Sequence, residues 1–188
     1  YADELEQLGN FSPIFSLEGP REQTDARRGD GVFDAVVSAM GRCRERGIPF
    51  GASLTATRDN FDQLIGDEFI GFLDEQGCMY IWIFQYIPIG RDPDFDQMLT
   101  PEQRGNLAIR SNEIRAEYPL VVLDFWNDGR FVDGCIAGGR IYLRINAAGD
   151  VESCAFIHYA TDNINDCSLQ EALQNSLFME FARRQPFN

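Results

Sequence analysis

Two of the five cysteines, Cys135 and Cys154, have the setting expected of iron–sulfur ligands. They flank a predicted hairpin, each beside glycine or another small residue, and small neighbours let backbone amides approach cluster sulfur atoms. The alternative is that both are ordinary buried thiols, as we expect for Cys43 in a helix and Cys78 in a strand, while Cys167 fits either description. An odd number of cysteines without an export signal argues against a disulfide framework.

A second group of polar residues follows three predicted strands, where parallel β/α sheets place their binding sites. The group consists of Ser16 and Glu18 after the first strand, Thr55, Thr57 and Asn60 after the second, and Gln85 and Tyr86 at the end of the third. Each of them alone is explained as well by ending a strand or capping a helix. Polar groups at all three strand ends, on one side of the sheet, favour a ligand site.

Arg27 and Arg28 lie in a segment that we expect to be a loop after Glu18. A guanidinium group binds a carboxylate or phosphate through two parallel hydrogen bonds, so an arginine here is a candidate ligand of an anion. The alternative is a solvated surface charge.

The elements expected to position these residues alternate between strand and helix. Apolar runs at 11–17, 49–57 and 78–87 predict strands, and apolar residues at helical spacing predict helices at 30–47 and 59–77. Runs that are apolar along their whole length are typical of parallel strands covered on both faces. The fold class is therefore α/β, and three strands with an unpaired edge predict half of a β/α barrel.

The character of the sequence changes near residue 119. Thr100 and Gln103 form a capping-box pattern with proline at the first helical position, and Pro119 ends the predicted helix. The residues that follow predict a strand at 120–126, a glycine-rich loop at 127–139, a β-hairpin at 140–156 and short helices at 168–188. We expect an α/β domain at 1–118 and a small α+β domain at 119–188.

Composition argues against several classes of function. The net charge of −14 repels phosphate backbones, so nucleic acid is not an expected partner. The sequence contains neither an apolar stretch of about 18 residues nor a signal peptide, which predicts a cytoplasmic protein without a membrane partner. All 16 basic residues are arginines, which excludes a lysine Schiff base, and the single histidine excludes a multi-histidine metal site.

Taken together, these segments resemble radical S-adenosylmethionine (SAM) enzymes that carry a SPASM or twitch iron–sulfur extension. Residues 15–40, 47–64 and 84–90 are similar to the family's fourth, fifth and sixth barrel strands with their loops. Cys135, Gly149 and Cys154 fit the signature that opens the extension: cysteine, 9 to 15 residues, glycine, four residues, cysteine. The resemblance implies the C-terminal half of a parallel (β/α)6 partial TIM barrel at 1–118 and the start of a SPASM/twitch domain at 119–188.

The resemblance also implies roles for individual residues. Ser16 and Arg28 match positions that contact SAM in the sulfatase-maturase branch, and Ile87 matches the segment that packs against adenine. The strand with Thr55, Thr57 and Asn60 often contributes to the same pocket, which makes Glu18, Gln85 and Tyr86 at the neighbouring strand ends candidates as well. Cys135 and Cys154 match ligands of an auxiliary [4Fe–4S] cluster, here a partial site.

The sequence departs from the family at three places. It lacks the CxxxCxxC loop that holds the SAM-cleaving cluster, and it lacks the later cysteines of the extension. Ala155 stands where the maturases have an acidic base, which leaves His158 and Asp124 as weak candidates for a catalytic base.

For a parent enzyme the resemblance implies an oxidoreductase that reductively cleaves SAM to a 5′-deoxyadenosyl radical and abstracts hydrogen from a peptide or protein. An electron donor would be a further partner. Two alternatives remain for this chain: a non-catalytic structural or binding fragment, and a small α/β domain that binds an anion through Arg28.

Overall fold

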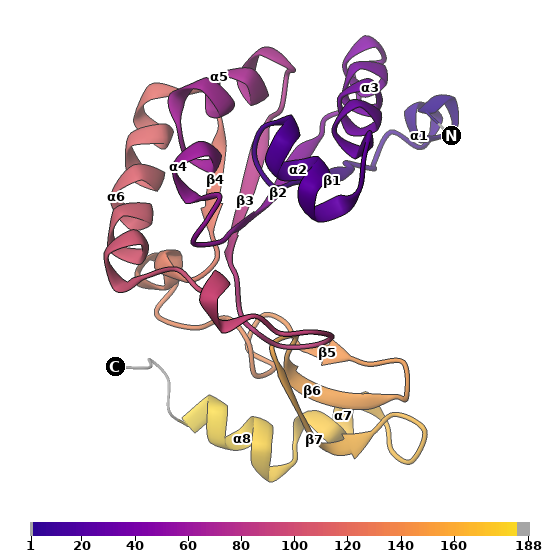
Figure 1. Cartoon of the computed structure of the whole chain (residues 1–188). Coiled ribbons are helices and arrows are strands. Elements are labelled where there is room, and N and C mark those ends of the chain that lie inside the picture. Colours follow the sequence, from indigo (N-terminus) through magenta and orange to yellow (C-terminus); the bar gives the residue numbers. More distant parts are fainter. Residues whose placement is uncertain (1, 184–188) are drawn as a thin grey trace. The chain divides into compact units, whose positions relative to one another are not determined.

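The computed structural model describes residues 2–183, and the chain divides into two compact units after Phe125. The first unit (Figure 1) contains α1 (Ala2–Leu8), β1 (Ile14–Leu17), α2 (Arg21–Arg28), α3 (Val32–Glu45), β2 (Gly51–Ala56), α4 (Phe61–Leu64), α5 (Asp67–Glu75), β3 (Tyr80–Gln85), η1 (Phe95–Gln97), α6 (Pro101–Glu117) and β4 (Val121–Asp124). The second contains η2 (Asn127–Phe131), β5 (Arg144–Ile145), β6 (Asp150–Cys154), β7 (Ile157–Asn163), α7 (Leu169–Leu173) and α8 (Ser176–Arg183).

The first unit is built on a four-stranded parallel sheet in the order β1-β2-β3-β4. The three apolar runs of the sequence form adjacent parallel strands, as predicted. One rung of the sheet aligns Ser16, Ser53, Trp82 and Leu123 across all four strands. This register places the ends of β1, β2 and β3 at one edge of the sheet.

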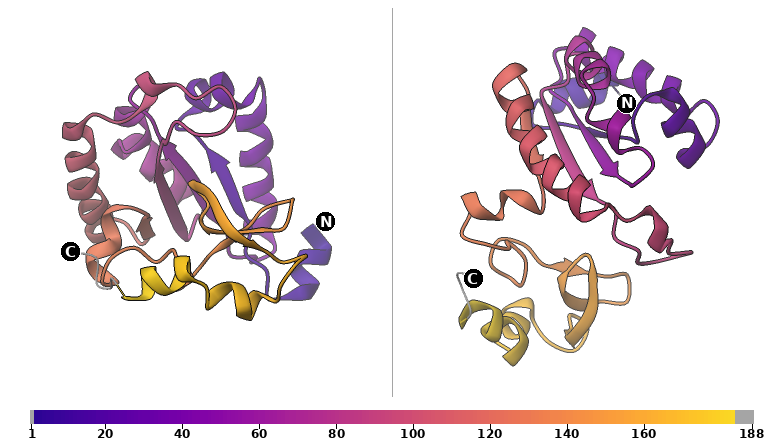
Figure 2. Two further views of the ribbon diagram at one scale, coloured as in Figure 1. Left: turned by 90° about the horizontal axis from the view of Figure 1, so that it is seen from below. Right: turned by 60° about the vertical axis from the view of Figure 1, so that its left-hand side comes forward.

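The helices cover one face of this sheet. A single apolar core joins the strands to α3, α4, α5 and α6, and Figures 1 and 2 show these helices around the sheet. Its fully buried strand residues include Leu17, Leu54, Ile81 and Ile83, which alternate with half-buried residues pointing to the other face. The expectation that both faces are covered is therefore wrong within the described unit. In the sequence, the aromatic residues of β3 on its uncovered side could not be distinguished from residues of a second buried face.

The segment that we expected to be a loop after Glu18 forms helix α2. Residues 21–28 have no apolar stripe that would predict a helix, and polar contacts hold the segment instead. Thr24 Oγ1 accepts a hydrogen bond from Glu18 N (3.0 Å) and donates one to Gly19 O (2.8 Å). Arg28 therefore stands in the last turn of a helix rather than in a loop.

Helix α6 begins as the sequence predicts. Thr100 Oγ1 accepts from Gln103 N (3.1 Å), and the Gln103 side chain accepts from Thr100 N (3.0 Å), which completes the capping box. Strand β4 follows and pairs with β3, so the compact units divide after Phe125 rather than at the expected 118/119 boundary. Pro119 ends the helix, but the strand that follows it still belongs to the first sheet.

The second unit contains an antiparallel sheet in the order β5-β6-β7. The predicted hairpin is present as β5 and β6, and β7 adds a third strand. Val151, Ala172 and Phe178 form its buried core, against which Leu143 and Leu177 pack. Across residues 2–183, every helix is too short or too polar to span a bilayer.

Candidate functional site

Asn60 joins the ends of β1 and β2. Its Nδ2 donates to Glu18 O (2.9 Å) and Thr55 O (3.0 Å), and its Oδ1 accepts from Thr57 N (2.8 Å). The backbone N–H of Asn60 donates in return to Thr57 Oγ1 (3.2 Å). Asn60 and Thr57 are both buried, and the Asn60 side chain does not cap α4. The sequence placed these residues in a binding site, and the structure shows that they also fix its framework.

Glu18 is a buried carboxylate held between two arginines of α2. Its Oε1 lies 2.6 Å from a terminal nitrogen of Arg28, and its Oε2 lies 3.1 Å from Arg27 Nη1. Burial raises the pKa of Glu18, while the positive charges of Arg27 and Arg28 act in the opposite direction. The carboxylate therefore fixes the direction of both guanidinium groups, each of which stays partly exposed.

An open pocket of about 740 Å³ lies over these strand ends. Four of the residues predicted from the sequence line it, namely Glu18, Thr57, Asn60 and Tyr86. The guanidinium of Arg27 lies 5.6 Å from the centre of the Tyr86 ring, and Tyr86 Oη accepts a hydrogen bond from Asp94 N (3.1 Å). The pocket is therefore bounded by α2, the loop after β2 and the loop after β3.

Ser16 and Thr55 lie on the uncovered face of the sheet. Side chains alternate along a strand, so Ser16 shares this face with Ser53 and Trp82 of its own rung, and Thr55 shares it with Phe84. Ser16 and Thr55 are half-buried, and among residues 2–183 neither hydroxyl has a hydrogen-bond partner. Two hydroxyls that are free to bind therefore lie on this face.

Aromatic rings form a wall on the same face. Trp82 and Phe84 have ring centres 5.0 Å apart, and Phe125 lies 5.2 Å from Phe84. Gly51 faces Tyr80 across the sheet, and a Cβ at Gly51 would overlap the Tyr80 ring. The sequence analysis missed this wall, although β3 carries aromatic residues at alternate positions, Tyr80, Trp82 and Phe84, which a strand places on one face.

Gln85 and Ile87 complete the predicted group. Gln85 is 7% exposed, and its Nε2 is a buried side-chain atom that lacks a hydrogen-bond partner within the described residues. A buried donor without a partner costs about 1–3 kcal/mol, which is consistent with a group reserved for a ligand or an ordered water. Ile87 is half-buried, directly after Tyr86.

In the second unit, the segments that carry Cys135 and Cys154 are tied together. Gly138 N donates to Ser153 O (2.8 Å), next to Cys154. The Tyr142 hydroxyl lies 3.0 Å from Cys154 Sγ, and burial together with this hydrogen bond raises the pKa of Tyr142. The sequence analysis missed this contact between Tyr142 and Cys154.

These residues do not by themselves complete an iron–sulfur site. Cys154 Sγ accepts a hydrogen bond from Phe156 N (3.4 Å), as a cluster thiolate does, but Cys135 is exposed. A [4Fe–4S] cluster takes four ligands. Within residues 2–183, no group of three or more His, Cys, Asp or Glu side chains is placed to hold a metal.

The two weak candidates for a catalytic base lie in different settings. Asp124 is fully buried and accepts a hydrogen bond from Ser111 Oγ of α6 (3.1 Å), so it points away from the uncovered face. His158 is exposed on β7, with Nε2 3.3 Å from Ala155 O. Asp124 ends β4, but its carboxylate is buried against α6, and His158 belongs to the other unit, so neither lines the pocket over the strand ends.

Comparison with known proteins adds information about the fold. No family model and no curated protein matches the sequence. The structure matches anSMEcpe with bound AdoMet and Cp18Cys peptide, with a TM-score of 0.68 and 16% identity over 96% of this chain and 55% of that chain. This chain has that fold.

Structures of SuiB from Streptococcus suis match as well. SuiB bound to S-adenosylmethionine gives a TM-score of 0.68 at 14% identity, and SuiB bound to precursor peptide SuiA gives 0.66 at 11%. The matches cover 96% and 97% of this chain, respectively, and 46% of SuiB. The chain therefore spans about half the length of these proteins.

Proposed function

We propose that this chain is part of a radical SAM enzyme, in which it holds SAM and faces a peptide substrate. Its fold is shared with two proteins whose structures hold SAM and a peptide, and residues 15–40 carry the family resemblance. The observation that carries the proposal is the unpartnered pair of hydroxyls, Ser16 and Thr55, on the uncovered face of the sheet.

The architecture supports half of a barrel. Consecutive parallel strands with all covering helices on one face are the arrangement of β/α barrels, whose sites lie at the carboxyl ends of the strands. The first unit then corresponds to the C-terminal half of a (β/α)6 partial barrel, and the second unit to the start of a SPASM/twitch domain.

Residues of the uncovered face, of α2 and of the loop after β3 suggest how SAM is held. Ser16 and Thr55 donate hydrogen bonds to its polar groups, Arg28 binds its carboxylate, and Tyr86 and Ile87 pack against its adenine. Glu18 aims Arg28, because one carboxylate oxygen holds that guanidinium at 2.6 Å. The aromatic wall of Trp82, Phe84 and Phe125 limits access of water to the reacting atoms. Held by these residues, SAM would supply the radical chemistry: one electron from a donor would cleave a sulfonium C–S bond to give methionine and a 5′-deoxyadenosyl radical, which would take a hydrogen atom from the peptide.

Arg28→Gln tests the assignment of the carboxylate. We expect it to weaken SAM binding about tenfold, because a charge-assisted hydrogen bond contributes roughly 1.5–3 kcal/mol, and to leave adenosine binding unchanged. Titration calorimetry with both ligands measures the difference. Arg21→Gln is the matched control, since Arg21 belongs to the same helix but pairs with the exposed Asp34 of α3 rather than with Glu18. Equal weakening of SAM and adenosine, or no weakening, contradicts the assignment.

The proposed auxiliary site is testable through its cysteines. Anaerobic addition of iron, sulfide and an external thiol to complete the ligand set should give thiolate-to-iron absorbance that Cys135→Ser and Cys154→Ser each reduce at least by about half. Cys78→Ser is the control, because burial raises the pKa of Cys78 to about 11 and keeps that thiol protonated. Equal losses in all three variants would show that iron binds without preference for the pair.

A further inference from the structure

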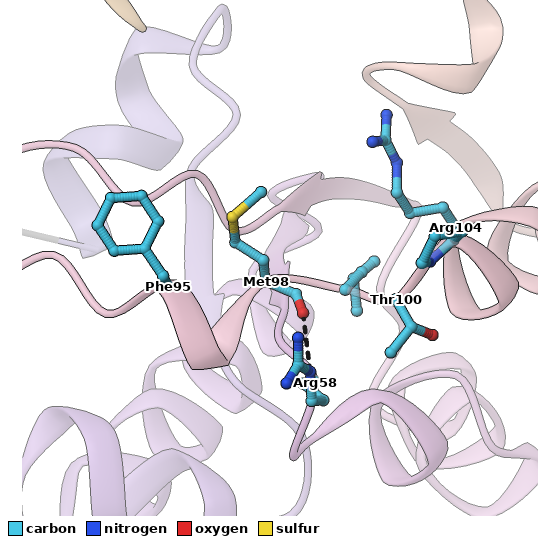
Figure 3. Close-up of a pocket in the computed structure, with 7 residues that line it drawn as sticks. Arg58, Phe95, Met98, Thr100 and Arg104 are labelled. Carbon is cyan, nitrogen blue, oxygen red and sulfur yellow. Dashed lines mark hydrogen bonds between the residues drawn. The ribbon is translucent and has the colours of Figure 1, made fainter.

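A second open pocket of the first unit lies between the loop after β2 and the start of α6 (Figure 3). It has a volume of about 570 Å³. Its lining residues, which we call the arginine pocket, are Arg58, Phe95, Met98, Leu99, Thr100, Pro101 and Arg104. None of them lines the pocket over the strand ends. The arginine pocket therefore shares no lining residue with the pocket over the strand ends or with the proposed SAM contacts.

The arginine pocket is positively charged in a strongly acidic protein. The chain has 30 acidic and 16 basic residues, yet two arginines and no acidic residue line this pocket. Within the described part of the chain, neither Arg58 nor Arg104 forms an ion pair, and the Arg104 guanidinium has no hydrogen-bond partner. Both guanidinium groups therefore remain available for a carboxylate.

Hydrogen bonds hold Arg58 in place before any ligand binds. Its Nε donates to Met98 O (3.1 Å), a contact drawn as a dashed line in Figure 3. Its backbone N–H donates to Gln97 O (2.9 Å), and its carbonyl accepts from Gln103 Nε2 (3.0 Å). The loop that carries Arg58 is thus fixed to η1 and α6, and a fixed donor loses less conformational entropy when it binds.

Apolar side chains form the rest of the pocket. The Phe95 ring is 68% exposed and Met98 is 37% exposed, beside the buried Leu99. Exposed aromatic and methionine side chains at the rim of a pocket favour contact with an apolar group of a ligand. The pocket therefore offers two cations and an apolar surface at the same place.

We infer that the arginine pocket binds an acidic residue of the peptide substrate together with an apolar side chain next to it, away from the reacting atoms. Arg104, whose guanidinium has no partner among the described residues, binds the carboxylate, and Phe95 and Met98 contact the apolar neighbour. The arginines of this pocket attract an acidic side chain, whereas the rest of this acidic chain repels it, so an acidic ligand is favoured at this pocket. This inference rests on the proposed function, which supplies a peptide as the ligand.

Methyl-labelled methionine gives a reporter inside the pocket. The chain has four methionines, of which Met98 lines the pocket and Met40 is fully buried in the core. The probe is the blocked dipeptide acetyl-Glu-Phe-amide, compared with acetyl-Gln-Phe-amide and with sodium acetate. We expect the Met98 methyl resonance to shift with the acidic dipeptide, while the Met40 resonance stays in place as a check on the fold.

Arg104→Gln should weaken this response about tenfold, the value of one charge-assisted hydrogen bond. Arg42→Gln, a change to an exposed arginine of α3 that lines neither pocket, should leave it unchanged. The inference is overturned if the amide dipeptide or acetate gives the same shift, or if Arg104→Gln has no effect. SAM binding, measured by calorimetry on the same samples, reports separately on the proposed function.

Discussion

Replacing Asn60 by alanine will destabilise the first unit by roughly 3 kcal/mol or more. The side chain is 6% exposed, and its loss leaves Glu18 O, Thr55 O and Thr57 N without the hydrogen bonds that now satisfy them. Each buried polar group left unpaired costs about 1–3 kcal/mol, which places this change among the severe point mutations. Without these hydrogen bonds the ends of β1 and β2 are held together less firmly. We therefore expect the affinity for SAM to decrease together with the stability of the unit.

Urea denaturation followed by Trp82 fluorescence, in a Trp126→Phe background, measures this effect on the first unit alone. Asn112→Ala is the matched control, because the Asn112 side chain bonds only along the exposed face of α6, to Ala108 O and Arg115. We expect that control to change the unfolding free energy by no more than about 0.5 kcal/mol. If Asn60→Ala lowers the unfolding free energy by no more than the control does, Asn60 does not hold the strand ends together.

Gly149→Ala will destabilise the second unit by roughly 2–3 kcal/mol. The backbone of Gly149 has φ +93°, which side chains of other residues rarely adopt. A Cβ there would also lie 2.5 Å from Asn165 Nδ2 and 2.7 Å from Asn163 Oδ1. Both asparagines bind Ala148 O at the turn before β6, so the added methyl group strains the backbone and displaces these contacts.

The effect is read from Trp126 fluorescence in a Trp82→Phe background, because Trp126 packs on Phe156 in the second unit. Gly105→Ala provides a control of opposite sign. Gly105 is exposed within α6, has open space around its Cβ position, and should gain about 0.5–1 kcal/mol as alanine. If Gly149→Ala is as stable as the parent chain, the conformation at Gly149 does not depend on glycine.

The sequence predicted three of the four strands of the first sheet and their parallel pairing, because long apolar runs separated by helical patterns leave few alternatives. It did not predict α2, whose residues 21–28 are held by Thr24 and by ion pairs rather than by an apolar stripe. It also assigned 120–126 to the second domain. The stop at Pro119 ends a helix, but only tertiary pairing with β3 shows which sheet that strand joins.

The sequence indicated which residues stand at the strand ends but not the contacts that they make. Strand-end position identified Ser16, Thr55 and Asn60, yet which face each side chain occupies depends on register, which appears only when strands pair. Glu18 and Arg28 were named as separate ligands, and the structure joins them in one ion pair. Tyr142 carried no signal in the sequence, because it meets Cys154 only after the chain between them has folded back.

The indole N–H resonance of Trp82 tests the central claim most directly. Trp82 shares a rung and a face with Ser16, while Trp126 belongs to the other unit and serves as the reference in the same spectrum. The account predicts that SAM shifts the Trp82 resonance along a saturating curve, that Ser16→Val weakens this response, and that Trp126 does not move. A Trp82 resonance unaffected by SAM, or a shift that Ser16→Val leaves intact, would contradict SAM binding on the uncovered face.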